Sequence, residues 1–204
     1  MTEKMGFFKR LKALELPKKK LFAIALCQRM LPNYQLFSDI GNFGDPQVLD
    51  TLLNLLWQSM YDTKLKLNID LQLERLEVNT PNPEESDMYG VYPAMDAAVA
   101  LTSLLSAMES KVEDDIINIS KLSSSTVANY IEATCDIEFD KASALDDYIF
   151  AHEVMQEEKE MQNTLLNIIE SQEKITPNFI KGLRRDIVAV GISNIGISTP
   201  TKNS

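Results

Sequence analysis

Histidine is almost missing from this chain of 204 residues, in which His152 is the single example. A metal site built from several imidazoles is therefore excluded, and the zinc motif HExxH fails because "HEVMQ" has no second histidine. The Glu-x-x-His pair of di-iron bundles fails as well, because Ile149 stands where the glutamate should be. We expect no metal and no cofactor. We interpret His152 as a structural residue at the edge of the core, with a general base as the alternative.

Cysteine and glycine are scarce, with two and seven residues respectively. No CxxC motif occurs, so Cys27 and Cys135 are predicted to be reduced thiols buried in helical segments, although a disulfide between them stays open. The glycine motifs GxGxxG, GxxxxGKS/T and GxSxG are all missing. This removes the common nucleotide-binding loops and the nucleophile elbow of hydrolases. With no catalytic constellation in the sequence, we lean towards a protein that is not an enzyme.

Long apolar runs are missing too. No stretch reaches the ~18 apolar residues of a membrane span, and the run "LFAIALC" is not followed by a small-residue cleavage site. We therefore expect no membrane contact and a cytoplasmic location. A net charge of −10 also argues against direct binding of nucleic acids, whose phosphates require clustered lysines and arginines.

The charge is unevenly distributed along the chain. Residues 1–31 hold eight lysines and arginines against two glutamates, a net charge of +6 that leaves −16 for the rest. We predict that this basic segment packs against the chain's own acidic surface. The alternative is that it contacts a membrane surface or a nucleic acid.

Helical periodicity runs through almost the whole chain, and no convincing strand interrupts it. Pro32 marks a helix boundary, and Thr176-Pro177 is expected to start the last helix. The pattern predicts an all-α, single-domain bundle of about eight or nine helices. Residues 1–198 are expected to form the domain, and 199–204 a disordered tail.

The most apolar segment is 94–108, which is rich in alanine and leucine. A helix that is apolar nearly all round is a central one, so we place this segment in the middle of the bundle. The sequence "SKVE" at 110–113 is predicted to cap the next helix. A long helix is expected from about Ser143 to Ser171, and its middle, "HEVMQEEKEMQ", is interpreted as mostly solvated.

Asp96 is the one carboxylate in that apolar segment. Because an unpaired buried carboxylate is costly, Asp96 should have a partner, and we prefer Arg184 or Arg185. We interpret this group first as a structural tie and second as a small-ligand pocket, in which an arginine and a helix start hold an anionic ligand. The candidates for ligand binding are Tyr89, Tyr92, Asp96, Arg184 and Asn194.

Five short stretches stand in a characteristic order: "LCQRMLPNYQLF", "NFGDPQ", "DMYGVYPAMDAAVAL", "IKGLRRDI" and "GISNIGIS". Together they resemble the YjaG family of bacterial proteins of unassigned function, with Asn42 as a departure from the family's pattern. The resemblance covers residues 7–198 and implies an all-α, single-domain fold in the bacterial cytoplasm, with no established activity. It also implies a shared site composed of Tyr89, Gly90, Tyr92, Asp96, Arg184, Asp186, Ser193 and Asn194.

Three hypotheses for function follow. The leading one is a non-enzymatic helical protein that binds another macromolecule, as a homodimer, through apolar residues left exposed on its helices. The alternative is a small-molecule-binding protein or enzyme with a pocket near Tyr89, Asp96 and Arg184. A third treats the acidic surface as a mimic of nucleic acid that occupies a basic partner.

Overall fold

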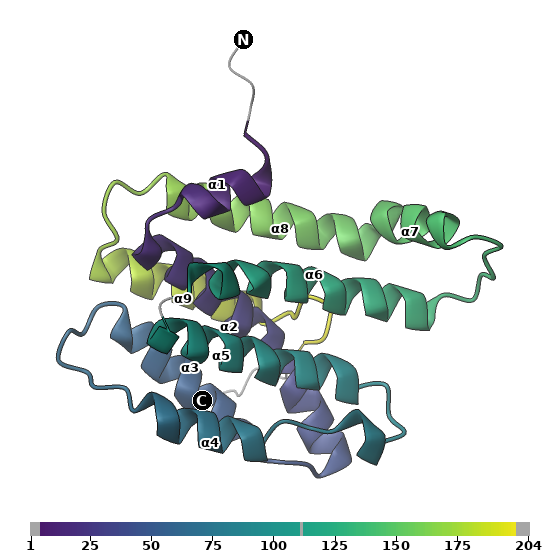
Figure 1. Ribbon diagram of the computed structural model, residues 1–204, viewed down its shortest axis with the longest axis horizontal. Coiled ribbons are helices and arrows are strands. Elements are labelled where there is room, and N and C mark those ends of the chain that lie inside the picture. The colour runs from purple at the N-terminus through teal and green to yellow at the C-terminus, as the bar shows by residue number, and fades with distance from the viewer. Residues whose placement is uncertain (1–4, 111, 199–204) are drawn as a thin grey trace.

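The computed structural model describes residues 5–110 and 112–198, and within these ranges the chain forms nine α-helices and one short 3-10 turn (Figure 1). An isolated antiparallel bridge joins Ile192 and Ser198, and the described residues contain no longer strand. The predicted all-α bundle is therefore confirmed, whereas the tail predicted at 199–204 lies outside the described residues. The elements are α1 (Phe7–Ala13), α2 (Leu16–Gly41), α3 (Pro46–Ser59), α4 (Ile69–Val78), η1 (Pro83–Glu85), α5 (Val91–Ser110), α6 (Glu113–Thr134), α7 (Ala142–Ala151), α8 (Glu153–Glu170) and α9 (Pro177–Val190).

The longest helix, α2, lies at the centre of the bundle. It contacts α3, α5, α6, α8 and α9, and its residues 21–27 are completely buried. The helix continues through Pro32, so the boundary predicted there is wrong. A proline inside a helix costs about 3 kcal/mol. The large apolar side chains buried on both sides of it contribute about 1.5–3 kcal/mol each, which outweighs that cost.

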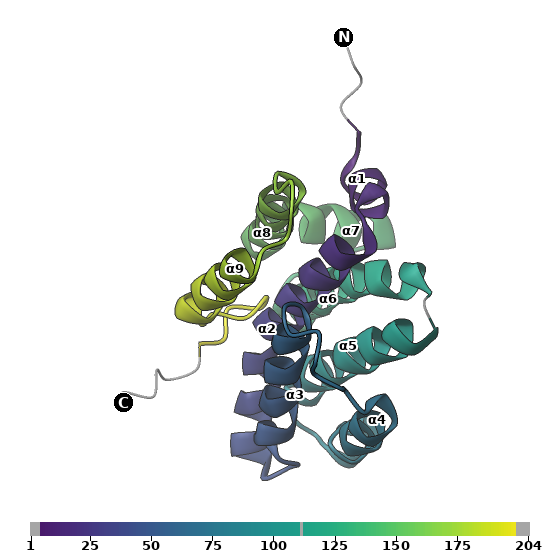
Figure 2. The same cartoon turned by 90° about the vertical axis from the view of Figure 1, so that its left-hand side faces the viewer.

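The apolar helix predicted at 94–108 is α5, which packs against α2, α4 and α6 and shares the centre with α2. In Figures 1 and 2 it lies between α4 and α6. Helix α5 is long and apolar enough to cross a membrane, but 61% of its most apolar stretch is buried inside the bundle, as in a core helix. One of its faces is uncovered, and Val99 on that face is 37% exposed.

Every helix except α7 contributes buried side chains to one main apolar core. A second, smaller core joins the end of α6 to α7, α8 and the turn that follows α9. Its buried members are Val127, Ile131, Ile149, Met155 and Ile195. The buried apolar contact of α7 is therefore made through the smaller core.

The long helix predicted at 143–171 is two helices, α7 and α8, with His152 between them. His152 has an extended backbone, with φ −62° and ψ 139°. Its Nδ1 accepts a hydrogen bond from the Val154 backbone N–H at 3.3 Å, which caps the start of α8. The histidine thus has a structural role at the helix junction.

The two helix caps named from the sequence have different outcomes. Thr176 Oγ1 accepts a hydrogen bond from the Phe179 backbone N–H at 3.2 Å and starts α9, as predicted. The capping box predicted at 110–113 does not form, because α5 runs as far as Ser110 and α6 begins at Glu113.

The basic N-terminal segment packs on acidic groups of the same chain, as predicted. Four of its basic residues form ion pairs with carboxylates of α6 and α8. Four of the segment's eight positive charges are therefore paired within the fold. The pairs are Arg10 with Glu170, Lys12 with Asp114, Lys19 with Glu113 and Arg29 with Glu158.

Both cysteines are free thiols. Cys27 is buried in α2, and burial raises the pKa of its thiol to about 12. Cys135 directly follows the last residue of α6, so its predicted place inside a helix is off by one residue. It is half-buried, so the predicted burial is wrong for this thiol.

Candidate functional site

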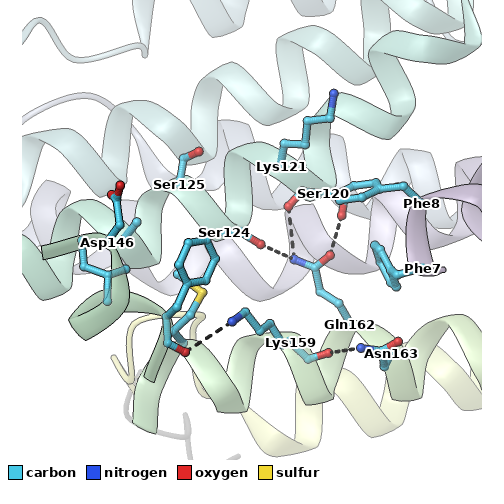
Figure 3. A pocket seen from close by; sticks show the side chains of 14 residues that line it. Phe7, Phe8, Ser120, Lys121, Ser124, Ser125, Asp146, Lys159, Gln162 and Asn163 are labelled. Atoms are coloured by element: carbon cyan, nitrogen blue, oxygen red, sulfur yellow. Dashed lines mark hydrogen bonds between the residues drawn. The ribbon is translucent and has the colours of Figure 1, made fainter. Parts of the chain in front are cut away.

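A cavity lies between α1, α6, α7 and α8, and we call it the α6–α8 cavity (Figure 3). Its volume of about 530 Å³ lies within the range of ~300–1,000 Å³ that is typical of small-molecule sites. Its lining divides into an apolar set and a polar set. The apolar residues are Phe7, Phe8, Ala128, Ile149, Phe150 and Met155. The polar residues are Ser120, Lys121, Ser124, Ser125, Asp146, Lys159, Gln162 and Asn163.

Gln162 forms the polar floor of the α6–α8 cavity, and it is only 3% exposed. Its Oε1 accepts a hydrogen bond from Ser120 Oγ at 2.5 Å. Its Nε2 donates to the Ser120 carbonyl oxygen and to Ser124 Oγ, both at 3.2 Å. Figure 3 shows these bonds running between α8 and α6. Because both ends of the amide are used, its orientation is fixed.

Glu158 lies one turn before Gln162 on α8 and is 0% exposed. Its Oε1 accepts hydrogen bonds from Gln162 Nε2 and from Ser123 Oγ, each at 2.6 Å. Its Oε2 is paired with the guanidinium of Arg29, on α2. A buried carboxylate is costly unless it is paired and hydrogen-bonded, and these three contacts meet that requirement. The prediction that this part of α8 is mostly solvated is therefore wrong for Met155, Glu158 and Gln162, which are buried.

The buried network continues into the turn that follows α9. Asn194 Nδ2 donates to the Ser123 carbonyl oxygen at 3.0 Å, and Asn194 Oδ1 accepts from Asn33 Nδ2 at 2.9 Å. The turn itself is closed by a hydrogen bond of 2.8 Å from the Ser193 backbone N–H to the Ile197 carbonyl oxygen. Asn194 is 1% exposed. It therefore joins α2 to α6 in the interior and does not line the α6–α8 cavity.

The mouth of the cavity carries two exposed aromatic rings, each beside a lysine. Lys159 Nζ lies 4.5 Å from the ring centre of Phe150, and Lys121 Nζ lies 5.9 Å from that of Phe8. Phe150 is 58% exposed and Phe8 is 44% exposed. Exposed rings next to a cavity mark a surface suited to binding. The mouth therefore offers apolar contact and two positive charges in one place.

Three of the predicted site residues meet at the start of α5. The ring of Tyr89 lies 5.9 Å from that of Tyr92 and 6.4 Å from that of Tyr130. Asp96 Oδ2 accepts a hydrogen bond from Thr126 Oγ1 at 2.7 Å, and burial raises the pKa of Asp96. Burial, and then the charge of Asp96, raises the pKa of Tyr89 to about 12. The Tyr89 hydroxyl is buried and has no hydrogen-bond partner among the described residues.

Arg184 is not part of that cluster. It donates a hydrogen bond to Asn54 Oδ1 on α3, while Arg185 pairs with the adjacent Asp186 at 2.9 Å. The predicted pairing of Asp96 with either arginine is therefore wrong. The physical reason is that α9 packs against α2, whereas the Asp96 side chain reaches α6. The five candidates for ligand binding thus lie in three different places.

Sequence reasoning missed the α6–α8 cavity and the buried network beneath it. A signal was present in α8, where Met155, Glu158, Gln162, Leu165 and Ile169 follow one buried helical stripe. A glutamate and a glutamine at positions that continue an apolar stripe indicate buried polar groups with partners elsewhere in the fold.

Comparison with known proteins assigns the chain to a family. Residues 6–198 match the family described as "Protein of unknown function (DUF416)", so the chain belongs to that family. The "Uncharacterized protein YjaG" of Salmonella typhimurium is 35% identical over 190 residues, which are 93% of this chain and 94% of that protein. The protein of the same description from Escherichia coli K12 is 34% identical over 189 residues, covering 92% and 94% of the two chains. A crystal structure of a DUF416 family protein from Shewanella baltica is 67% identical, has a TM-score of 0.91 and covers 96% of this chain and 100% of that one.

Proposed function

We propose that this protein is a non-catalytic binding protein, and that its α6–α8 cavity holds a small amphipathic ligand with an apolar body and an anionic end. One observation carries this function: a cavity of ligand size combines an apolar lining, a fixed polar floor and a cationic mouth. Ligand sites have this composition because apolar area supplies affinity and a few placed polar groups supply orientation.

The apolar lining supports a ligand with an apolar body. Phe7 packs against Phe22 and Phe8, with ring centres 6.2 Å and 5.1 Å apart. Ile149 and Met155 belong to the smaller core, so this wall is held in place before any ligand arrives. Each 100 Å² of apolar ligand surface removed from water would contribute about 2.5 kcal/mol.

The mouth supports an anionic end. The charged residues of the cavity lining are two lysines, Lys121 and Lys159, and one carboxylate, Asp146. This excess of positive charge occurs on a chain whose net charge is −10. An anionic group held at the mouth would stay partly hydrated while the body of the ligand lies inside, which avoids the cost of burying a charge.

A binding role fits the floor better than a catalytic one. Ser120 donates its hydroxyl hydrogen to the amide oxygen of Gln162, and an amide oxygen is not a general base. The same amide holds Ser124 Oγ as an acceptor. The polar groups of the floor are therefore hydrogen-bonded to each other. Such groups can fix the shape of the cavity and orient a ligand, but they do not provide a base for proton transfer.

We also propose that the protein works in the bacterial cytoplasm as a homodimer. Its relatives in Salmonella typhimurium and Escherichia coli are bacterial. A surface for self-association is available where α9 ends, because Val188, Val190 and Ile192 are 51%, 65% and 47% exposed. Exposed apolar side chains of this kind favour contact with another chain.

Native mass spectrometry of the protein purified from its host tests ligand and oligomer together. We expect a non-covalent extra mass of small-molecule size, carried by a dimer. A bare monomer would contradict both parts, and a bare dimer would contradict the ligand alone.

A cavity-filling variant tests the position of the site. We expect Ala128→Phe to weaken binding of the fluorescent probe 1-anilinonaphthalene-8-sulfonate by about tenfold or more, which is about 1.4 kcal/mol. Decanoate should compete with the probe. The control is Ala133→Phe, the same change at an exposed position of α6 that does not line the cavity. Binding by Ala128→Phe that equals the control would overturn the assignment.

A further inference from the structure

A separate groove lies between α4 and α5, at the edge of the bundle where Figure 2 shows α4. Its volume is about 710 Å³, and we call it the α4–α5 groove. No residue that lines it also lines the α6–α8 cavity. The two sites are therefore built from different residues.

The wall on α5 is a straight stripe of side chains. Met95, Val99, Thr102 and Ser106 line the groove at successive spacings of four, three and four residues. Residues at these spacings lie above one another on one face of a helix, over a length of about 16 Å. Leu73 of α4 stands on the opposite wall. The groove thus has the shape that accepts the apolar face of another helix.

The rim on α4 is acidic. Glu74 and Glu77 line the groove and are exposed, and no ion pair of the described chain includes them. The whole of residues 68–90 holds six acidic residues and one arginine, a net charge of −5 that is half of the total of −10. The acidic residues are Asp70, Glu74, Glu77, Glu84, Glu85 and Asp87.

We propose that the α4–α5 groove binds a basic amphipathic helix of a partner protein. The apolar residues of that helix lie on the stripe of Met95 and Val99, and its lysines or arginines face Glu74 and Glu77. Apolar contact supplies the affinity of such helix-in-groove complexes, and complementary charge selects the partner and speeds its association.

Two other occupants fit the charge less well. A bacterial membrane surface is anionic, so the acidic rim is repelled from it. A second copy of this chain, docked through the same face, brings no lysine or arginine of the groove lining to pair with Glu74 and Glu77. A basic partner is attracted by the excess of negative charge and is therefore the occupant that fits this groove best.

The test is a titration of the full chain with a fluorescein-labelled peptide of about 14 residues, long enough to span the stripe as a helix. The peptide contains leucines at helical spacing and lysines elsewhere. A peptide of the same composition in scrambled order is the control for helical pattern. We expect the patterned peptide to bind more tightly, and we expect its affinity to fall as salt screens the rim charges.

Two variants locate the binding. We expect Val99→Asp to abolish binding of the patterned peptide, and Glu74→Lys with Glu77→Lys to weaken it about tenfold or more. The matched control is Glu132→Lys with Glu173→Lys, which changes the net charge by the same amount at exposed positions away from the groove. Circular dichroism of each variant checks that the helices are intact.

Several outcomes would overturn this assignment. Equal binding of patterned and scrambled peptides, or an equal loss in the control double variant, would show unspecific attraction to an acidic protein. Binding to phosphatidylglycerol vesicles that is lost in Val99→Asp would assign the groove to a membrane. A dimer in sedimentation that Val99→Asp dissociates would assign it to a second copy.

Discussion

Glu158 of α8 is a buried carboxylate and Asp96 of α5 is a half-buried one, and the fold holds them in different ways. Helix α6 lies between α5 and α8 (Figure 1) and donates a hydrogen bond to each carboxylate. Ser123 donates to Glu158, and Thr126, almost one turn further along α6, donates to Asp96. Glu158 also has an amide and the guanidinium of Arg29, so its charge is matched in the interior. Asp96 has the single hydroxyl, and burial raises its pKa. The first carboxylate is therefore a structural anchor beneath a cavity, and the second is a group whose protonation the fold favours.

The largest effect is expected from Glu158→Gln. The change preserves volume but leaves the Arg29 guanidinium without its carboxylate, so we expect a loss of about 3–5 kcal/mol in the free energy of unfolding. Urea denaturation measures it. The control is Glu157→Gln, an exposed neighbour on the same helix. A loss below about 1 kcal/mol would mean that the pair is not an anchor, because exposed ion pairs have that value.

Thr126→Val is expected to have a smaller effect. It keeps the shape of the side chain but removes the hydroxyl that Asp96 accepts from, which costs about 1–3 kcal/mol of stability. A double-mutant cycle with Asp96→Asn separates this hydrogen bond from the other contacts of Thr126. If Thr126→Val costs the same in both backgrounds, the two side chains are not coupled.

Asp96→Asn should change stability at neutral pH by less than about 1 kcal/mol, because the amide oxygen still accepts from Thr126. The pH dependence is the sharper test. Since the folded chain raises the pKa of Asp96 above its ordinary value of 3.8, it holds a proton more tightly than the unfolded chain does. The contribution of Asp96 to stability is therefore present below pH ~4 and falls as the pH rises through its folded pKa. The measurement is the free energy of unfolding as a function of pH. In Asp96→Asn its dependence on pH should lack the contribution of Asp96, and a pH dependence equal to that of the unchanged protein would contradict the raised pKa.

The smallest effect is expected from Tyr89→Phe. The Tyr89 hydroxyl is buried without a partner among the described residues, so its removal should leave stability within about 0.5 kcal/mol or raise it slightly. Tyr130→Phe, at the neighbouring ring of the same cluster, is the comparison. Thermal unfolding of the two variants measures both. A loss of more than about 1 kcal/mol in Tyr89→Phe would mean that its hydroxyl is hydrogen-bonded, for instance by water.

The helical class and the start of α9 could be predicted from local sequence. Thr176 shows this well, because a cap depends on residues within one turn of each other. Pro32 shows the limit: its local preference is to end a helix, and the packing of α2 against five other helices overrides that preference. Tertiary contacts of this kind cannot be predicted from any short segment of the sequence.

The candidate site was less predictable than the fold. The sequence indicated that Asp96 is buried and needs a partner. It has a partner in Thr126, but its side chain is only half-buried. It did not indicate which helix faces the Asp96 side chain, so the predicted partner was Arg184 or Arg185 and not Thr126. Glu158 stands among other charged residues of α8 in the sequence. Its burial becomes evident only when the residues of α8 are assigned to helical faces by their spacing.

Asn33 and Asn194 are joined by a hydrogen bond that spans 161 positions of the chain. During synthesis from the N-terminus, α2 and α6 emerge long before Asn194 does. Until then the Asn33 amide and the Ser123 carbonyl lack the side chain that joins them. The interior of this protein therefore reaches its final set of hydrogen bonds only when the last turn has been made, and nascent chains that stop short of it should be the ones that proteases and chaperones recognise.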